Sequence, residues 1–157
     1  MRPTIDDTLM SIATVWEQRS TCNRNSVGAV ISLQGRHIGS GYNGPPAGMP
    51  HCDHPVTTVT FARLNVSPLP PLPASSYDRG CREAIHAEAN ALAYCARHGV
   101  AIEGGTIYTT LSPCYSCSQL IIAAGLVRVV FNRSYRDPAG IDLLRNSGLI
   151  VDKIGTR

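Results

Sequence analysis

The second half of the chain alternates helical and β-rich segments, and this alternation restricts the fold more than any other feature of the sequence. Each predicted helix ends at or just before a glycine, as helix C-caps commonly do. Strands that alternate with helices of this length are typical of right-handed crossovers between parallel strands. The predicted segments are a helix at 82–98, a strand at 106–111, a helix at 113–124, a strand at 127–131, a helix at 138–146 and a strand at 149–154.

The first half predicts one helix and a β-hairpin. Apolar residues recur at helical spacing between Thr4 and about Arg19, which indicates an amphipathic helix. Two β-rich runs, Val27–Leu33 and His37–Tyr42, follow with a short link around Gly35. The sequence therefore predicts an α/β fold with a mixed five-stranded sheet, in which an antiparallel hairpin is followed by parallel strands and helices flank the sheet.

The chain has the size of one domain. With 157 residues and 43% hydrophobic content it can fill one core, so we predict a single domain over residues 1–157. Residues 43–80 are rich in proline and glycine and predict a long loop, with one short element around residues 56–64. Loops of this length are usually functional, so we expect a lid, a partner surface or a metal-bound flap.

Charge and composition exclude several classes of protein. The net charge of +3 comes from scattered basic residues, which favours a small substrate over a nucleic acid polymer. No apolar stretch approaches the roughly 18 residues of a membrane helix, and the first residues lack a signal-peptide pattern, so we expect a cytoplasmic protein without membrane contact. In a reducing compartment the 6 cysteines indicate metal binding or catalysis, although Cys95 in mid-helix is interpreted as a buried thiol.

Two short motifs, His86-Ala87-Glu88 and Pro113-Cys114-Tyr115-Ser116-Cys117, predict a metal centre. Both fall near predicted helix starts, where free backbone N–H groups and the helix dipole favour the thiolate that binds zinc. Pro113 suits the first helical turn, so that Cys114 and Cys117 project from one face. One imidazole and two thiolates leave the fourth tetrahedral position to water, which is the arrangement of a catalytic zinc.

Glu88 completes the predicted chemistry. A lone His-x-Glu is common by chance, and a lone Cys-x-x-Cys is also found in redox pairs and zinc ribbons, but together they match the signature of zinc deaminases. Zinc would lower the pKa of bound water from about 15.7 towards 7, so that hydroxide could attack the amine-bearing carbon of a ring. Glu88 would carry the proton to the ring nitrogen and then protonate the departing ammonia.

Longer stretches resemble one family within this superfamily, the deoxycytidylate (dCMP) deaminases of phages and bacteria. The resemblance covers nearly the whole chain and is carried by residues 22–30, 41–48, 52–53, 85–91 and 109–114, with Gly41-Tyr42-Asn43-Gly44 as its most distinctive part. It implies a three-layer cytidine-deaminase-like fold and conversion of dCMP to dUMP for dTMP synthesis. It also implies an oligomer, usually a hexamer, that dCTP activates and dTTP inhibits, with Mg²⁺ accompanying the triphosphates.

Four residues are candidates for holding the substrate. Asn43 leads a glycine-rich turn and its amide can donate and accept, although asparagine also occurs in turns for its backbone preferences alone. Arg24 is a candidate phosphate ligand and otherwise a solvated arginine. Tyr135 follows a strand end and either closes over the base or packs at an interface. Ala87, between the ligand histidine and Glu88, is assigned to the same site.

Three further cysteines, Cys22, Cys52 and Cys81, lie at the edges of the long loop and are candidates for a second, structural zinc site. Some relatives carry such a zinc around the cysteines that correspond to the first two. His51 and His54 flank Cys52, but neither is clearly aligned as a fourth ligand. The alternative is that these cysteines are buried thiols and the histidines are exposed.

Two other functions stay open at the level of the sequence. One is a deaminase with another substrate, such as a 5-substituted dCMP, a riboflavin intermediate, guanine or tRNA adenosine. The other is a non-catalytic, zinc-stabilised regulatory module, against which the intact Glu88 argues.

Overall fold

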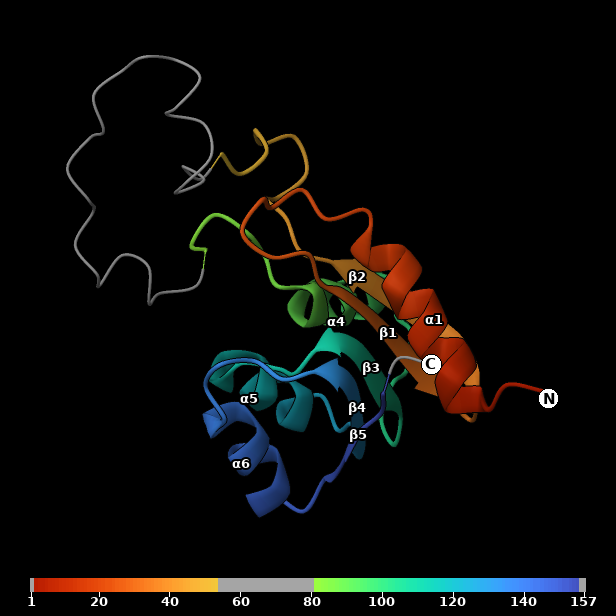
Figure 1. Cartoon of the computed structure of the whole chain (residues 1–157). Helices are drawn as coiled ribbons and strands as arrows, with labels where there is room; N and C mark the ends of the chain where they lie inside the picture. The colour runs from red at the N-terminus through yellow and green to blue at the C-terminus, as the bar shows by residue number, and fades with distance from the viewer. Residues whose placement is uncertain (1, 54–80, 156–157) are drawn as a thin grey trace, which may run out of the picture.

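The computed structural model of the chain describes residues 2–53 and 81–155, which form an open sheet covered by helices on both faces (Figure 1). The elements alternate in the second half as the sequence predicts. In chain order they are α1 Ile5–Glu17, β1 Gly28–Leu33, β2 Arg36–Tyr42, α4 Ala87–Arg97, β3 Thr106–Leu111, α5 Tyr115–Ala123, β4 Arg128–Arg133, α6 Ala139–Asn146 and β5 Ile150–Lys153.

The sheet has five strands in the order β2-β1-β3-β4-β5. β1 pairs antiparallel with β2 and with β3, whereas β3, β4 and β5 run parallel to one another. The start of β1 and the ends of β3 and β4 therefore lie at the same edge of the sheet. The predicted mixed sheet, with a hairpin followed by parallel strands, is confirmed.

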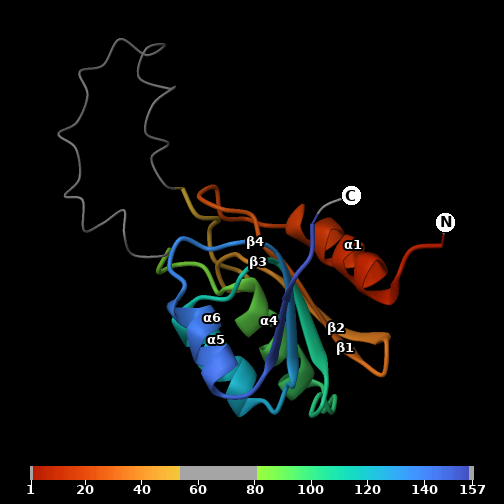
Figure 2. The ribbon, with the colours of Figure 1, turned by 60° about the horizontal axis from the view of Figure 1, so that its bottom comes forward.

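Two apolar clusters lie on the two faces of the sheet, so the fold has three layers (Figure 2). α1 covers one face through Leu9, Met10 and Ala13. The other face packs against α4, α5 and α6 in the larger cluster. Val30 and Ile31, neighbours in β1, point to opposite clusters, as the alternation of side chains along a strand requires.

Two glycines of β2 let α4 approach the sheet closely. A Cβ atom at Gly41 would lie 2.5 Å from the backbone oxygen of Ala87, in the first turn of α4. A Cβ atom at Gly39 would collide with the Cys95 side chain further along the same helix. These strand positions therefore have no room for a side chain.

A polar cluster fastens the start of α1 to the sheet. Arg128 donates to both carboxylate oxygens of Asp6, at 2.9 and 2.8 Å, and to Asp152 at 2.8 Å. The Tyr108 hydroxyl also donates to Asp6, at 2.7 Å. Its hydrogen bonds with Arg128 hold the pKa of the Asp6 carboxyl below its usual range, although partial burial opposes this shift.

Some expected boundaries are wrong, and one expectation lies outside the described residues. α4 begins at Ala87 rather than near residue 82, because His86 is an extended N-cap and Ile85 instead bridges to Gly44. Pro113 precedes the N-cap of α5 rather than occupying its first turn. The short element expected at residues 56–64 falls in the undescribed range. Within residues 2–53 and 81–155, none of the helices has the length and apolarity needed to cross a bilayer.

Candidate active site and metal centres

The predicted zinc ligands lie on two helix N-termini that meet beyond the end of β3. His86 is the N-cap of α4 and Cys114 the N-cap of α5, and neither side chain caps its own helix. Cys117 follows in the first turn of α5. The first N–H groups of a helix lack intrahelical acceptors and carry partial positive charge, so this position favours thiolates.

The distances between the donor atoms fit a zinc ion. Nδ1 of His86 lies 3.4 Å from Sγ of Cys114 and 3.4 Å from Sγ of Cys117. A tetrahedral zinc with Zn–S of about 2.3 Å and Zn–N of about 2.0 Å would hold nitrogen and sulfur about 3.5 Å apart. The cluster consists of these three ligands in the described residues, which leaves one tetrahedral position for water.

The pKa shifts within the cluster favour a negatively charged thiolate, which can bind a cation. Hydrogen bonds from Cys117 and His86 lower the pKa of Cys114 to about 4. The pKa of Cys117 is raised, because its thiol donates to Cys114 and is buried. The hydrogen bond with Cys114 raises the pKa of His86, although burial opposes this. Without a metal the cluster therefore keeps one thiolate, and a divalent cation would favour the second.

Glu88 lies in the first turn of α4, two residues beyond the ligand His86, and is only 4% exposed. Burial raises the pKa of Glu88 to about 7, while its own backbone N–H and the neighbouring His86 act in the opposite direction. A carboxyl group with this pKa can both accept and donate a proton near neutral pH. This is the property that the sequence analysis requires of a proton shuttle.

A cavity of about 300 Å³ opens beside these residues, with His86, Glu88 and Cys114 in its wall. The structure brings all of the predicted substrate residues to the lining of this cavity, namely Arg24, Asn43, Ala87 and Tyr135. The volume lies at the small end of the usual range for ligand pockets. The cavity therefore suits a small molecule.

Asn43 holds the cavity wall together with its amide group. Its Nδ2 donates to the carbonyl of Asn25 at 2.7 Å, and its Oδ1 accepts the N–H of Val27 at 2.8 Å. One N–H and one lone pair remain beyond these two bonds. Asn43 thus has a definite structural role, and its amide also lines the cavity.

Arg136 is a cavity residue that the sequence analysis missed. Its guanidinium carbon lies 5.6 Å from the ring centre of Tyr135, and both residues line the cavity together with Arg24. The signal was present, because Arg136 directly follows Tyr135 beyond a strand end. Ser112 was also missed: its hydroxyl accepts the N–H of Tyr135 at 2.7 Å and fixes that loop.

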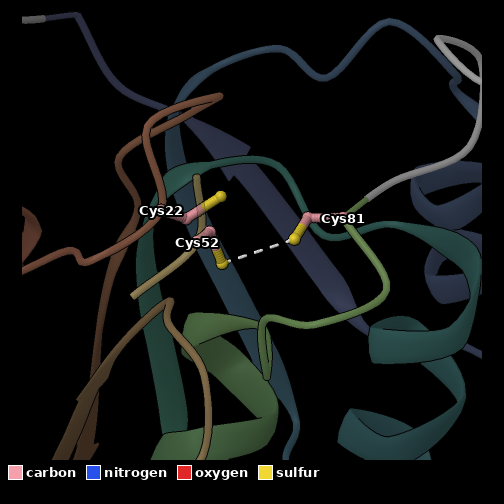
Figure 3. Close-up of side chains that lie close together, drawn as sticks. All are labelled: Cys22, Cys52 and Cys81. Carbon is pink, nitrogen blue, oxygen red and sulfur yellow. Dashed lines mark hydrogen bonds between the residues drawn. The ribbon is translucent and has the colours of Figure 1, made fainter. Parts of the chain in front are cut away.

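The second group of cysteines is also brought together (Figure 3). Cys22, Cys52 and Cys81 come from three connecting segments, and their sulfur atoms all lie within 4.8 Å of one another. Sγ of Cys52 is 3.6 Å from Sγ of Cys81, against about 3.8 Å for two sulfurs on a tetrahedral zinc. The three thiols therefore fit a metal ion, which would sit next to the cavity because Cys22 and Cys81 line its wall.

This second cluster also divides its protons unequally. Burial and the hydrogen bond with Cys81 raise the pKa of Cys52 to about 12. Burial acts on Cys81 as well, but backbone N–H groups and the Cys52 thiol outweigh it and lower the pKa of Cys81. Of the candidate fourth ligands, His51 is exposed and His54 lies outside the described residues.

Comparison with known proteins identifies the class of this fold and site. The family pattern of the cytidine and deoxycytidylate deaminase zinc-binding region matches residues 3–133. The chain is 44% identical over 132 residues to the deoxycytidylate deaminase of Mycobacterium phage D29, covering 83% of this chain and 95% of the relative. It is 35% identical over 167 aligned positions to the deoxycytidylate deaminase of Enterobacteria phage T2, with 92% and 89% covered.

The chain therefore belongs to the cytidine and deoxycytidylate deaminase family. Within that family its similarity is to deoxycytidylate deaminases. The dCMP deaminase of the cyanophage S-TIM5, solved in complex with dCMP and dUMP, superposes with a TM-score of 0.78 at 30% identity. The match covers 98% of this chain and 99% of that one, so the predicted cytidine-deaminase-like fold is confirmed.

Proposed function

We propose that the protein deaminates dCMP hydrolytically to dUMP and ammonia, which would feed dTMP synthesis. The observation that carries the proposal is the buried Glu88 beside the His86, Cys114 and Cys117 cluster, in the wall of a cavity that Arg24 and Arg136 also line. The similarity to phage deoxycytidylate deaminases, and to a structure that holds dCMP and dUMP, supports this choice of substrate.

In this proposal His86, Cys114 and Cys117 would hold a zinc ion. When bound, zinc supplies Lewis acidity, which makes water acidic enough to act as a nucleophile near neutral pH. Glu88 moves the protons. It passes one water proton to the ring nitrogen N3 and the other to the amine on C4, while oxygen bonds to C4 and the C4–N bond breaks to release ammonia.

The remaining cavity residues would hold the nucleotide. Arg24 and Arg136 would bind the phosphate, because each guanidinium can donate to two oxygens. Tyr135 would cover the base, and Asn43 would use the N–H and the lone pair that remain on its amide beyond its two backbone bonds. Ala87 would contribute its backbone N–H, which has no intrahelical acceptor at the first position of α4.

An ammonia-release assay on dCMP, CMP, deoxycytidine, 5-methyl-dCMP and dCTP tests the proposal. We expect turnover of dCMP and at least a tenfold preference over deoxycytidine, because the arginines act only on the phosphate. Turnover of the nucleoside but not of the monophosphate would overturn the choice of substrate. Preference for 5-methyl-dCMP would support the alternative deaminase, and no turnover of any compound would support the regulatory module.

We also propose a second, structural zinc at Cys22, Cys52 and Cys81. The support is the spacing of the three sulfurs and the cysteine ligands that structural zinc sites use, and a fourth ligand would close the site. Elemental analysis of purified protein tests it. Two zinc equivalents per chain are expected, and one equivalent would eliminate this site.

Assembly and regulation are further proposals that rest on the family resemblance alone. We propose that the enzyme is a cytoplasmic hexamer. We also propose that dCTP activates it and dTTP inhibits it, each triphosphate accompanied by Mg²⁺. Light scattering gives the oligomeric state. Repeating the ammonia-release assay with each triphosphate, with and without Mg²⁺, tests the regulation.

A further inference from the structure

Two cavity walls come from segments that the sheet keeps apart. Residues 24–27 lead into β1, and residues 134–136 follow β4. In the sheet order β3 lies between β1 and β4, so two strand spacings, roughly 10 Å in total, separate the two segments. β1 and β4 are not neighbours in the sheet, so no backbone hydrogen bonds join these two strands directly. Each wall contributes one arginine to the cavity, Arg24 from the first and Arg136 from the second.

Arg133, the last residue of β4, crosses this gap with its side chain. Its Nε donates to the carbonyl of Thr110 in β3 at 3.3 Å. Its Nη2 donates to the carbonyl of Ser26 at 3.1 Å and also to the carboxylate of Glu17 at the end of α1. One rigid guanidinium therefore ties three parts of the edge together.

The segment that Arg133 reaches is held from the other side by Asn43. Asn43 bonds the backbone of Asn25 and Val27, and Arg133 bonds the carbonyl of Ser26 between them. Each of the three consecutive residues 25–27 therefore has a backbone group bonded by Asn43 or Arg133, whose side chains come from the ends of other strands.

The opposite cavity wall, residues 134–136, is also held by Arg133. The backbone carbonyl of Arg133 accepts the N–H of Ser112 at 2.8 Å, and the Ser112 hydroxyl accepts the N–H of Tyr135. Arg133 itself does not line the cavity, and its side chain is 53% exposed. It therefore connects both walls without reaching the space that the substrate would fill.

We propose that Arg133 is a positioning residue that sets the spacing between the two walls and so the fit of the nucleotide phosphate. The inference rests on the proposed function, because it assumes a phosphate held between Arg24 and Arg136. A misplacement of about 1 Å in such a site is enough to weaken function many-fold. An exposed ion pair alone contributes little to stability, so the effect falls on the substrate rather than on folding.

The test compares Arg133→Met, which keeps the aliphatic part of the side chain, with Arg133→Lys and with Arg145→Met as a matched control. Arg145 is exposed on α6 and lies away from the cavity wall. For Arg133→Met we expect KM for dCMP to rise about tenfold with kcat within about twofold of the unmodified protein. Arg133→Lys should recover part of the loss, and Arg145→Met should change neither constant.

Calorimetric binding of dUMP and deoxyuridine separates positioning from general damage. Arg133→Met should weaken dUMP about tenfold and leave deoxyuridine binding unchanged, because only dUMP carries the phosphate. Equal weakening of both ligands, a fall in kcat alone, or no change in KM would overturn the inference. Failure of the unmodified protein to release ammonia from dCMP would instead overturn the proposed function.

Discussion

The two cysteine clusters have similar donor spacing but differ in what holds their ligands in place. His86, Cys114 and Cys117 sit on the first turns of two helices that pack into the larger apolar cluster. Cys22, Cys52 and Cys81 sit on connecting segments, and a single β-bridge joins the first two. The apolar core positions His86, Cys114 and Cys117 without a metal, so a metal at this cluster would supply chemistry. A metal at the second cluster would instead hold its three connecting segments together.

Replacing Glu88 separates metal binding from chemistry at the first cluster and should have the largest effect of any change that leaves the zinc in place. We expect Glu88→Gln to keep its zinc and lower kcat for dCMP by about 10³-fold, because an amide cannot carry a proton. Measurements are zinc content and ammonia release. The matched control is Glu103→Gln at an exposed turn residue, which should retain full activity. Full activity of Glu88→Gln would remove Glu88 from the mechanism.

Alkylation of the metal-free protein should show unequal thiol reactivity within each cluster. At pH 7 Cys114 is a thiolate because its pKa is lowered to about 4, and Cys52 is protonated because its pKa is raised to about 12. Iodoacetamide should therefore label Cys114 on the order of 100-fold faster than Cys52. Peptide mapping by mass spectrometry measures the rates.

The same experiment includes the partner thiols. Cys81, whose pKa is lowered, should react before Cys52, and Cys114 should react before Cys117. Zinc should protect all of these residues. Equal labelling within each pair would contradict the unequal division of protons.

Removing one thiol from each cluster should separate cohesion from chemistry. Cys52→Ser should lose one zinc equivalent and lower Tm by about 5 °C, while kcat for dCMP stays within about twofold. Cys114→Ser should lose the other equivalent and all activity. Cys95→Ala, at a buried cysteine outside both clusters, should leave the zinc content unchanged. Loss of kcat in Cys52→Ser would mean that the second cluster also takes part in the chemistry.

The Asp6 and Arg128 pair provides a polar link without sulfur or metal, and its effect should be the smallest. Asp6→Asn should lower the free energy of unfolding at pH 7 by about 1 kcal/mol. Because the folded pKa of Asp6 is lowered, its stabilisation is present above the unfolded pKa of about 3.9 and is lost as the pH falls through the folded value. Urea unfolding should therefore show a difference at pH 7 that disappears in acid.

The sequence predicts those parts of the site that depend on local structure. His86 and Glu88 are two residues apart, and Cys114 and Cys117 three apart, so a helix start is enough to arrange each pair. The mixed sheet and most element boundaries followed from hydrophobic periodicity and glycine stops, whereas the spatial order of the strands was not predicted and the helix expected from residue 82 begins only at Ala87. Gly99, Gly125 and Gly148 all have positive φ, as the predicted helix ends require.

The remaining features depend on contacts between distant parts of the chain. Arg133 and Ser26 are 107 positions apart, and their hydrogen bond follows from the order of strands rather than from any motif. Ser112 was missed for the same reason, because its partner Tyr135 lies 23 positions away. From the sequence alone, Cys22, Cys52 and Cys81 were either ligands of a second zinc or buried thiols. The choice depends on whether the connecting segments around β1, β2 and α4 bring the three cysteines together.

The close contact between Gly41 and Ala87 has a consequence for how this protein can evolve. Gly41 belongs to the stretch that most distinguishes the resemblance to dCMP deaminases, yet what the structure requires of it is an absent side chain. A single added methyl group would push on the helix turn that carries His86 and Glu88. Laboratory selection for a new substrate should therefore find changes among the cavity residues and leave Gly41 untouched.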